Sequence, residues 1–246
     1  MVPFGMSLFH RYRGYLVHLY TASTLIFVIL GVQWVFEGSY RLALGAMAIT
    51  LMIDATDGML ARRFRVTETA AGVDGELLDN IVDFLSYVML PMLFMMRAEM
   101  LLTPVTLWVS FVVFASAFGF SRTTAKLADR GFFVGFPSYW NILVFYLFLL
   151  NSPPALNTLF VVLLSLLVFI PLRFLYVSRL QRWRTLHFTL SGVWGFLCVA
   201  ALFLPAGEIR TFLLLASLGY TVFYTVHSLW LDLRDRKPRL LERLRL

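Results

Sequence analysis

"LMIDATDGMLARRFRVTETAAGVDGELLDNIVDFLSYVMLP", residues Leu51 to Pro91, places four aspartates within or beside segments that are apolar enough to cross a bilayer. They are Asp54, Asp57, Asp79 and Asp83. A carboxylate at membrane depth costs a few kcal/mol or more unless a positive partner compensates it. Bound cations are therefore the expected partners of this cluster.

The composition is that of a polytopic membrane protein. Of the 246 residues, 60% are hydrophobic and only 14% are charged, and the mean hydropathy is +0.79. Such values exclude an ordinary soluble domain. The only cysteine, Cys198, lies in an apolar run, which excludes an internal disulfide and a multi-cysteine metal site. The N-terminal residues lack the pattern of a removable signal peptide, so the first span is expected to stay.

Eight apolar runs predict eight transmembrane helices. The predicted spans are 16–36, 42–60, 76–96, 104–125, 138–150, 156–177, 187–204 and 211–231. The fifth is short and is expected to be tilted or partly re-entrant. Residues 1–246 are expected to form a single membrane-embedded domain, with the acidic motif at 54–83 and a basic C-terminal tail at 232–246.

The basic residues predict the orientation of these spans. Eight spans put both termini on one side of the membrane, and that side would carry eighteen of the 21 Lys and Arg residues. Basic residues collect on the cytoplasmic side. The predicted fold class is therefore all-α, a polytopic integral membrane bundle of about eight transmembrane helices. Both termini and the aspartate cluster are expected on the cytoplasmic side.

The spacing of the aspartates predicts a metal site. Asp54 and Asp57 stand at i and i+3, and Asp79 and Asp83 at i and i+4, so each pair shares one face of its helix. Carboxylates from two helices can converge on a pair of divalent cations, which prefer oxygen ligands. The alternative is that these aspartates form ion pairs with the basic residues Arg62, Arg63 and Arg65. Nearby Asp74 is expected to be a helix N-cap.

The motif resembles that of a known family. Asp54-x-x-Asp57-Gly58-x-x-Ala61-Arg62 followed by Gly75-x-x-x-Asp79-x-x-x-Asp83 is similar to the signature of the CDP-alcohol phosphotransferases. Twelve residues separate Arg62 from Gly75, where most members have eight. Outside the signature, "LVHLYTAS" (16–23), "LARRF", "DGELLD" (74–79) and "KLADRGFFVGFPSYWN" (126–141) resemble the bacterial phosphatidylcholine synthase branch, in which a longer spacing is expected.

The resemblance implies roles for individual residues. Asp54, Asp57, Asp79 and Asp83 are the expected ligands of manganese or magnesium, with two ions bound, and Asp83 is also the expected catalytic base. The matched positions that should line the nucleotide and phosphate side are Gly58, Ala61, Arg62 and Gly75. Thr21 and Lys126 are further candidates for phosphate contact.

The branch resemblance implies the substrates CDP-diacylglycerol and choline, with phosphatidylcholine and CMP as products. A quaternary ammonium cannot donate a hydrogen bond and is usually held by aromatic faces. Tyr139 and Trp140 are the candidates, although aromatic residues also populate membrane interfaces without binding a ligand. The expected location is the bacterial inner (plasma) membrane, among membrane lipids, possibly as a homodimer as in relatives, with no nucleic-acid partner.

Two alternatives stay open. The first keeps the family and changes the acceptor to serine, inositol or glycerol phosphate. The second is a divalent-cation transporter, because aspartates inside a membrane can line an ion path. The remaining spans do not continue an acidic path across the membrane, which disfavours transport.

Overall fold

The computed structural model describes residues 8–122, 126–127, 131–180 and 182–243, and within them the side chains of 12–122, 131–180 and 182–235. By its internal contacts the chain divides into two compact units, 1–99 and 100–246. Each unit is described by itself.

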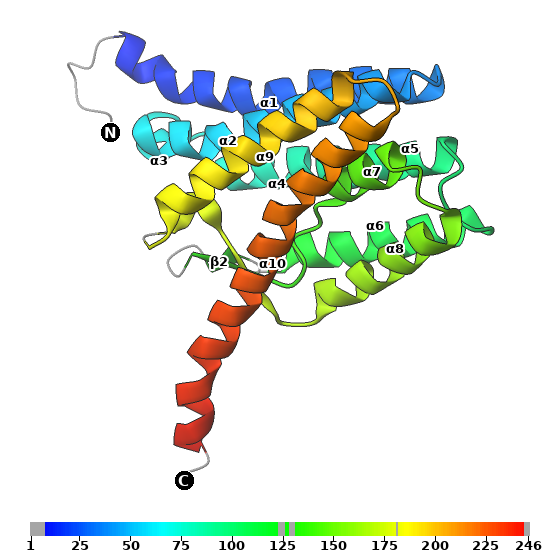
Figure 1. The fold of residues 1–246 in the computed structure, drawn as a ribbon. Coiled ribbons are helices and arrows are strands. Elements are labelled where there is room, and N and C mark those ends of the chain that lie inside the picture. The colour runs from blue at the N-terminus through cyan, green and yellow to red at the C-terminus, as the bar shows by residue number, and fades with distance from the viewer. Residues whose placement is uncertain (1–7, 123–125, 128–130, 181, 244–246) are drawn as a thin grey trace. The chain divides into compact units, whose positions relative to one another are not determined.

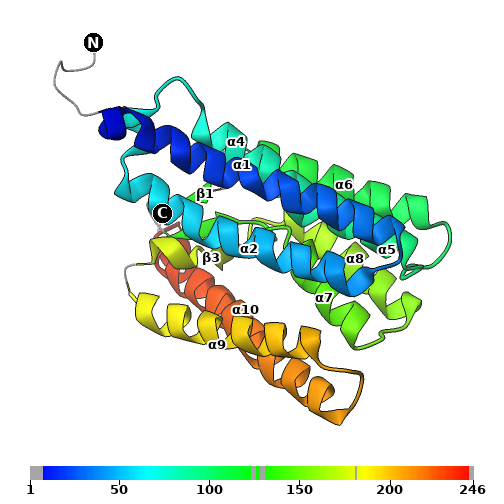
Figure 2. The same ribbon diagram turned by 90° about the horizontal axis from the view of Figure 1, so that it is seen from above.

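The first unit is built from long helices. They are α1 (Leu8–Phe36), α2 (Tyr40–Arg63), the short α3 (Val66–Thr69), and one continuous helical run composed of α4 (Gly75–Asp83), η1 (Phe84–Met89) and α5 (Leu90–Arg97). Helices α1 and α2 pack side by side along their length (Figure 2). The continuous run packs against α1, so the acidic ends of α2 and α4 belong to the same small bundle.

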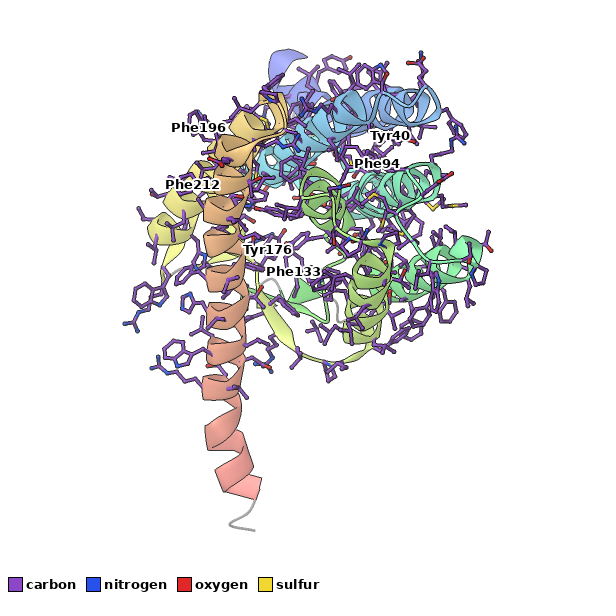
Figure 3. All side chains as sticks on the ribbon, turned by 45° about the vertical axis from the view of Figure 1, so that its right-hand side comes forward. Tyr40, Phe94, Phe133, Tyr176, Phe196 and Phe212 are labelled. Carbon is purple, nitrogen blue, oxygen red and sulfur yellow. The ribbon has the colours of Figure 1, made fainter. Side chains whose placement is uncertain are left out.

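The core of the first unit is apolar around the end of α1, the start of α2 and α5. Val35, Leu44, Leu90 and Phe94 are fully buried there. The rings of Tyr40 and Phe94 contact each other with centroids 5.1 Å apart (Figure 3), and the Tyr40 hydroxyl donates to the carbonyl of Arg97. These contacts join the start of α2 to the end of α5.

The second unit combines helices with a small sheet. Its helices are α6 (Val105–Ser121), α7 (Trp140–Leu149), α8 (Pro154–Phe169), the short η3 (Val177–Arg179), α9 (Arg184–Phe203) and α10 (Glu208–Arg243). Helices α6 and α8 pack as one pair, and α9 and α10 as another (Figure 1). The basic tail continues α10 as helix up to Arg243.

The three-stranded sheet corrects the all-α prediction. Strands β1 (Lys126–Leu127), β2 (Phe132–Val134) and β3 (Arg173–Leu175) are antiparallel, in the order β1-β2-β3. The predicted span 156–177 ran through β3, but α8 ends at Phe169. The reason is Pro171, since the residue before a proline is disfavoured in the helical region, and Ile170 is extended.

The sheet is fixed to α10. The Leu175 amide donates to Oγ of Ser228 at 3.1 Å, and the Tyr224 hydroxyl donates to the Leu175 carbonyl at 2.8 Å. Next to these bonds in sequence, Tyr176 stacks on Phe133 of β2 with ring centroids 4.3 Å apart (Figure 3). The buried Asp232 lies 3.6 Å from Nε of Arg173 in β3.

The helical membrane architecture is confirmed. Among the described residues, five helices are long and apolar enough to cross a bilayer, and α6, α7 and α8 are shorter apolar helices. Large apolar side chains face outward from these helices. For example, Phe196 and Phe212 are 73% and 69% exposed and project from α9 and α10 (Figure 3). The protein is a polytopic helical membrane protein, and the expected short fifth span corresponds to α7, with ten residues.

Candidate metal centre

Three of the four predicted ligands come together. Asp54 and Asp57 project from α2 and Asp79 from α4, with one carboxylate oxygen of each within 4.8 Å of the others. Asp57 is buried, and Asp54 and Asp79 are half-buried. Like charges at this separation repel each other strongly in a partly buried site. A set composed only of carboxylate oxygens suits a hard divalent cation such as magnesium or manganese.

Hydroxyl groups from neighbouring helices orient two of these carboxylates. Thr21 of α1 donates a 2.8 Å hydrogen bond to Oδ2 of Asp57. The Tyr87 hydroxyl, from η1, donates a 2.6 Å hydrogen bond to Oδ2 of Asp54. Each bond uses one of the roughly four acceptor sites that an ionised carboxylate offers.

Thr21 and Tyr87 both contact the carboxylates of the site. Thr21 is bonded to the expected ligand Asp57, and its predicted contact with phosphate stays a prediction. Tyr87 was missed. Its signal was the spacing of Asp79, Asp83 and Tyr87 at i, i+4 and i+8.

Asp83 lies outside the group of three. It is half-buried, ends α4 and directly precedes η1, and its carbonyl accepts a 3.4 Å hydrogen bond from Ser86. Its carboxylate is not one of the three within 4.8 Å of one another. Its roles as ligand and base stay predictions.

The two glycines of the motif have different surroundings. A Cβ atom added at Gly75 would lie 2.8 Å from Cε1 of His18, so a larger residue where α4 begins beside α1 would require the buried His18 ring to shift. At Gly58 an added Cβ would meet, within 4 Å and among the described residues, only Nη1 of Arg62, at 3.4 Å. The backbone of α2 is therefore open at Gly58, where a bulky ligand can approach it.

The remaining motif positions lie in the last turn of α2 and in the connection to α4. Ala61 packs against a small apolar cluster with Val17 and Val66, and the neighbouring Arg62 side chain is exposed. The N-cap prediction for Asp74 is confirmed, since its carboxylate accepts a 3.0 Å hydrogen bond from the Leu77 amide.

The candidates in the second unit are distributed over several elements. Lys126 lies in β1, and its side chain is outside the described part of the chain. Tyr139 is half-buried and directly precedes α7. Trp140 is fully buried, and its indole N–H donates a 2.9 Å hydrogen bond to Oγ of Ser116.

Known proteins are similar in sequence to this chain over most of its length. The model of the CDP-alcohol phosphatidyltransferase family matches residues 16–233. A phosphatidylcholine synthase of Legionella pneumophila subsp. pneumophila is 38% identical over 184 residues, which cover 73% of this chain and 70% of that relative. Phosphatidylcholine synthases of Bradyrhizobium diazoefficiens and Borreliella burgdorferi are 36% and 30% identical, over 78% and 91% of this chain and 72% and 96% of theirs.

Proposed function

The chain belongs to the CDP-alcohol phosphatidyltransferase family, and on this premise we propose that it transfers the phosphatidyl group of CDP-diacylglycerol to choline, releasing CMP. The products are phosphatidylcholine and CMP. The observation that carries the proposal is the convergence of three carboxylates from α2 and α4 within the family signature. The choice of choline rests on the relatives, which are named phosphatidylcholine synthases.

Asp54, Asp57 and Asp79 would hold a divalent cation, manganese or magnesium, and together with Asp83 they would hold two. When bound, such ions neutralise pyrophosphate charge and stabilise both the attacking and the leaving oxygen of a displacement. The three carboxylates suit such ions, because hard divalent cations prefer hard, anionic oxygen ligands.

The displacement exchanges one P–O bond for another. The choline hydroxyl oxygen forms a bond to the phosphorus on the lipid side, and the bond from that phosphorus to the oxygen bridging to CMP breaks. Asp83 accepts the hydroxyl proton, since it lies one helical turn beyond Asp79 toward the predicted membrane interior. The leaving electron pair stays on the CMP phosphate.

The nucleotide and phosphates would lie along the end of α2 and the start of α4. The open backbone at Gly58 gives room for the donor, and the exposed Arg62 guanidinium would make a bidentate contact with phosphate. Gly75 and Ala61 supply small surfaces beside it. Thr21 acts on this site through Asp57, and Lys126 is a further candidate for phosphate contact.

Choline would be held by an aromatic face. Tyr139 is the stronger of the two candidates, because it is half-buried, whereas the Trp140 ring is fully enclosed and its N–H is used by Ser116. A trimethylammonium group over a tyrosine face gains about 0.5–2 kcal/mol, depending on its desolvation.

The placement in the membrane follows the basic residues. We propose that the chain forms one domain of about eight helices in the bacterial inner membrane, in which the short α7 is tilted or partly re-entrant, with both termini and the carboxylates at the cytoplasmic side. A homodimer is proposed from the family alone.

The test is to incubate the purified protein with CDP-diacylglycerol and manganese or magnesium, and to offer one acceptor at a time. The expected result is release of CMP only with choline, together with phosphatidylcholine. Product formation with serine, inositol or glycerol phosphate instead would replace choline as acceptor. A protein that moves manganese across vesicles and releases no CMP with any acceptor would be a transporter.

A further inference from the structure

A buried tyrosine, Tyr87 of η1, forms a hydrogen bond with a carboxylate of α2. The Tyr87 side chain is 4% exposed, and its hydroxyl lies 2.6 Å from Oδ2 of Asp54, which is 33 residues earlier in the chain. The distance is that of a short O–H···O hydrogen bond, which ties the Tyr87 hydroxyl to the Asp54 carboxylate.

The helix is modified where this contact forms. Residues Phe84–Met89 form the π-helical segment η1, directly after Asp83. In a regular α-helix, the eight residue steps from Asp79 to Tyr87 would rotate the side chain about 80° beyond two full turns. A π-helical turn contains more residues and reduces this drift, so Tyr87 stays nearer the Asp79 face. Isolated π-helical turns are frequent at functional sites.

We propose that Tyr87 is a positioning residue for the metal centre, which holds the Asp54 carboxylate ready to bind a divalent cation. The inference rests on the metal site of the proposed function. By donating to Oδ2, the hydroxyl restricts rotation of the carboxylate, whose two oxygens together have about four acceptor sites. Groups that orient a ligand in this way typically change metal affinity by about 10–100-fold when removed.

The same arrangement occurs on the neighbouring ligand. Thr21 donates to Asp57 from α1, while Tyr87 donates to Asp54 from η1. The two α2 carboxylates are thus held from two different helices. Tyr87 differs from a simple core residue because its polar end points to a ligand of the site.

The decisive variant is Tyr87→Phe, which keeps the ring and removes the hydroxyl. The matched control is Tyr20→Phe. The Tyr20 hydroxyl of α1 also contacts α2, but it lies 2.8 Å from Oγ1 of Thr56 and not next to a carboxylate. Manganese alone is titrated into the full-length, detergent-purified proteins, and free manganese is measured by electron paramagnetic resonance. Thermal unfolding of the metal-free proteins is measured in parallel.

For Tyr87→Phe the manganese dissociation constant should rise by about 10–100-fold, while Tyr20→Phe binds as the wild type does. Raised manganese should restore most of kcat in Tyr87→Phe. Equal manganese affinity of wild type and Tyr87→Phe, or an equal loss in Tyr20→Phe, would overturn the inference. A wild-type protein that binds manganese, shows the Tyr87 effect and makes no phosphatidylcholine would overturn the proposed acceptor and leave this inference standing.

If Tyr87→Phe does not fold, Tyr87→Met replaces it, because methionine adapts to irregular core space and has no hydroxyl. Its manganese affinity should fall as expected for Tyr87→Phe. In the Asp54→Asn background it should add little further loss, because the carboxylate that the hydroxyl positions is already gone. Additive losses in this double-mutant cycle would overturn the proposal.

Discussion

Thr21 donates a 2.8 Å hydrogen bond to Oδ2 of Asp57, and both side chains are buried between α1 and α2. Serine and threonine hydroxyls in membrane helices commonly donate to a carbonyl of their own helix, as Ser23 does here to the Tyr20 carbonyl at 2.6 Å. Thr21 instead makes α1 part of the carboxylate site, although α1 contributes no acidic residue to it.

Thr21→Val should therefore weaken the metal site. Valine keeps the shape but leaves Asp57 without this donor, so we expect the manganese concentration for half-maximal activity to rise by about 10-fold or more. Thr21→Ser should retain near-normal behaviour, and Ser23→Ala is the matched control. An unchanged metal requirement in Thr21→Val would show that the bond does not support the site.

Asp54→Asn, Asp57→Asn and Asp79→Asn should each abolish turnover while leaving folding and membrane insertion intact. Each substitution removes one anionic ligand but also relieves repulsion within the metal-free cluster. Asp74→Asn is the control, because Asp74 is the N-cap of α4 and asparagine caps a helix about as well as aspartate. Near-normal activity of any of the three at saturating metal would remove that residue from the ligand set.

Asp83→Asn should impair chemistry more than donor binding. Asparagine keeps the size and one oxygen of the side chain but cannot accept the choline proton. We expect kcat to fall by about 100-fold or more, with CDP-diacylglycerol binding within a few-fold of wild type. Loss of donor binding with little further effect on kcat would assign Asp83 to the ligand set alone.

Tyr139→Leu should affect choline selectively. Removal of the ring's negative face at a cost of about 0.5–2 kcal/mol raises the Michaelis constant for choline about two- to thirtyfold. The constant for CDP-diacylglycerol should change little, and Tyr12→Leu, at an exposed tyrosine of α1, is the control. Trp140→Leu should instead lower thermal stability, because Trp140 is fully buried and bonded to Ser116. Equal effects of Tyr139→Leu on both substrates would indicate an interface anchor only.

Arg173→Gln should destabilise the second unit without changing the metal requirement. The variant leaves Asp232, which is 1% exposed, without its guanidinium partner at 3.6 Å. Breaking a buried ion pair on one side costs about 3–5 kcal/mol. Asp235→Asn is the control, since Asp235 is 47% exposed and lies 3.9 Å from Arg173. Thermal unfolding in detergent is measured for both variants. Equal unfolding midpoints of Arg173→Gln and Asp235→Asn would show that the buried ion pair does not stabilise the fold.

The parts of the fold that depend on local pattern were predictable from the sequence. Apolar runs gave the helices, with α2 at 40–63 against the predicted 42–60, and the spacing of Asp54 and Asp57 put both on one face. The strands were not predictable, because two or three residues are too few to show an alternating pattern.

The contacts of the site needed three dimensions. The π-helical segment changes the register by less than one turn, which no hydropathy pattern records, and it decides where Tyr87 points. Likewise, the motif fixes that Gly75 is a glycine, but only the approach of His18 gives the steric reason.

The attachment of β3 to α10 has a consequence for biosynthesis. The Leu175 amide and carbonyl bond to Ser228 and Tyr224, which are translated about fifty residues later. Until the ribosome has released the last helix, these two backbone groups have neither of these native partners, so the second unit completes its structure only at the end of insertion. A chain that stalls before Tyr224 would therefore present an unfinished strand to the quality-control proteases of the membrane.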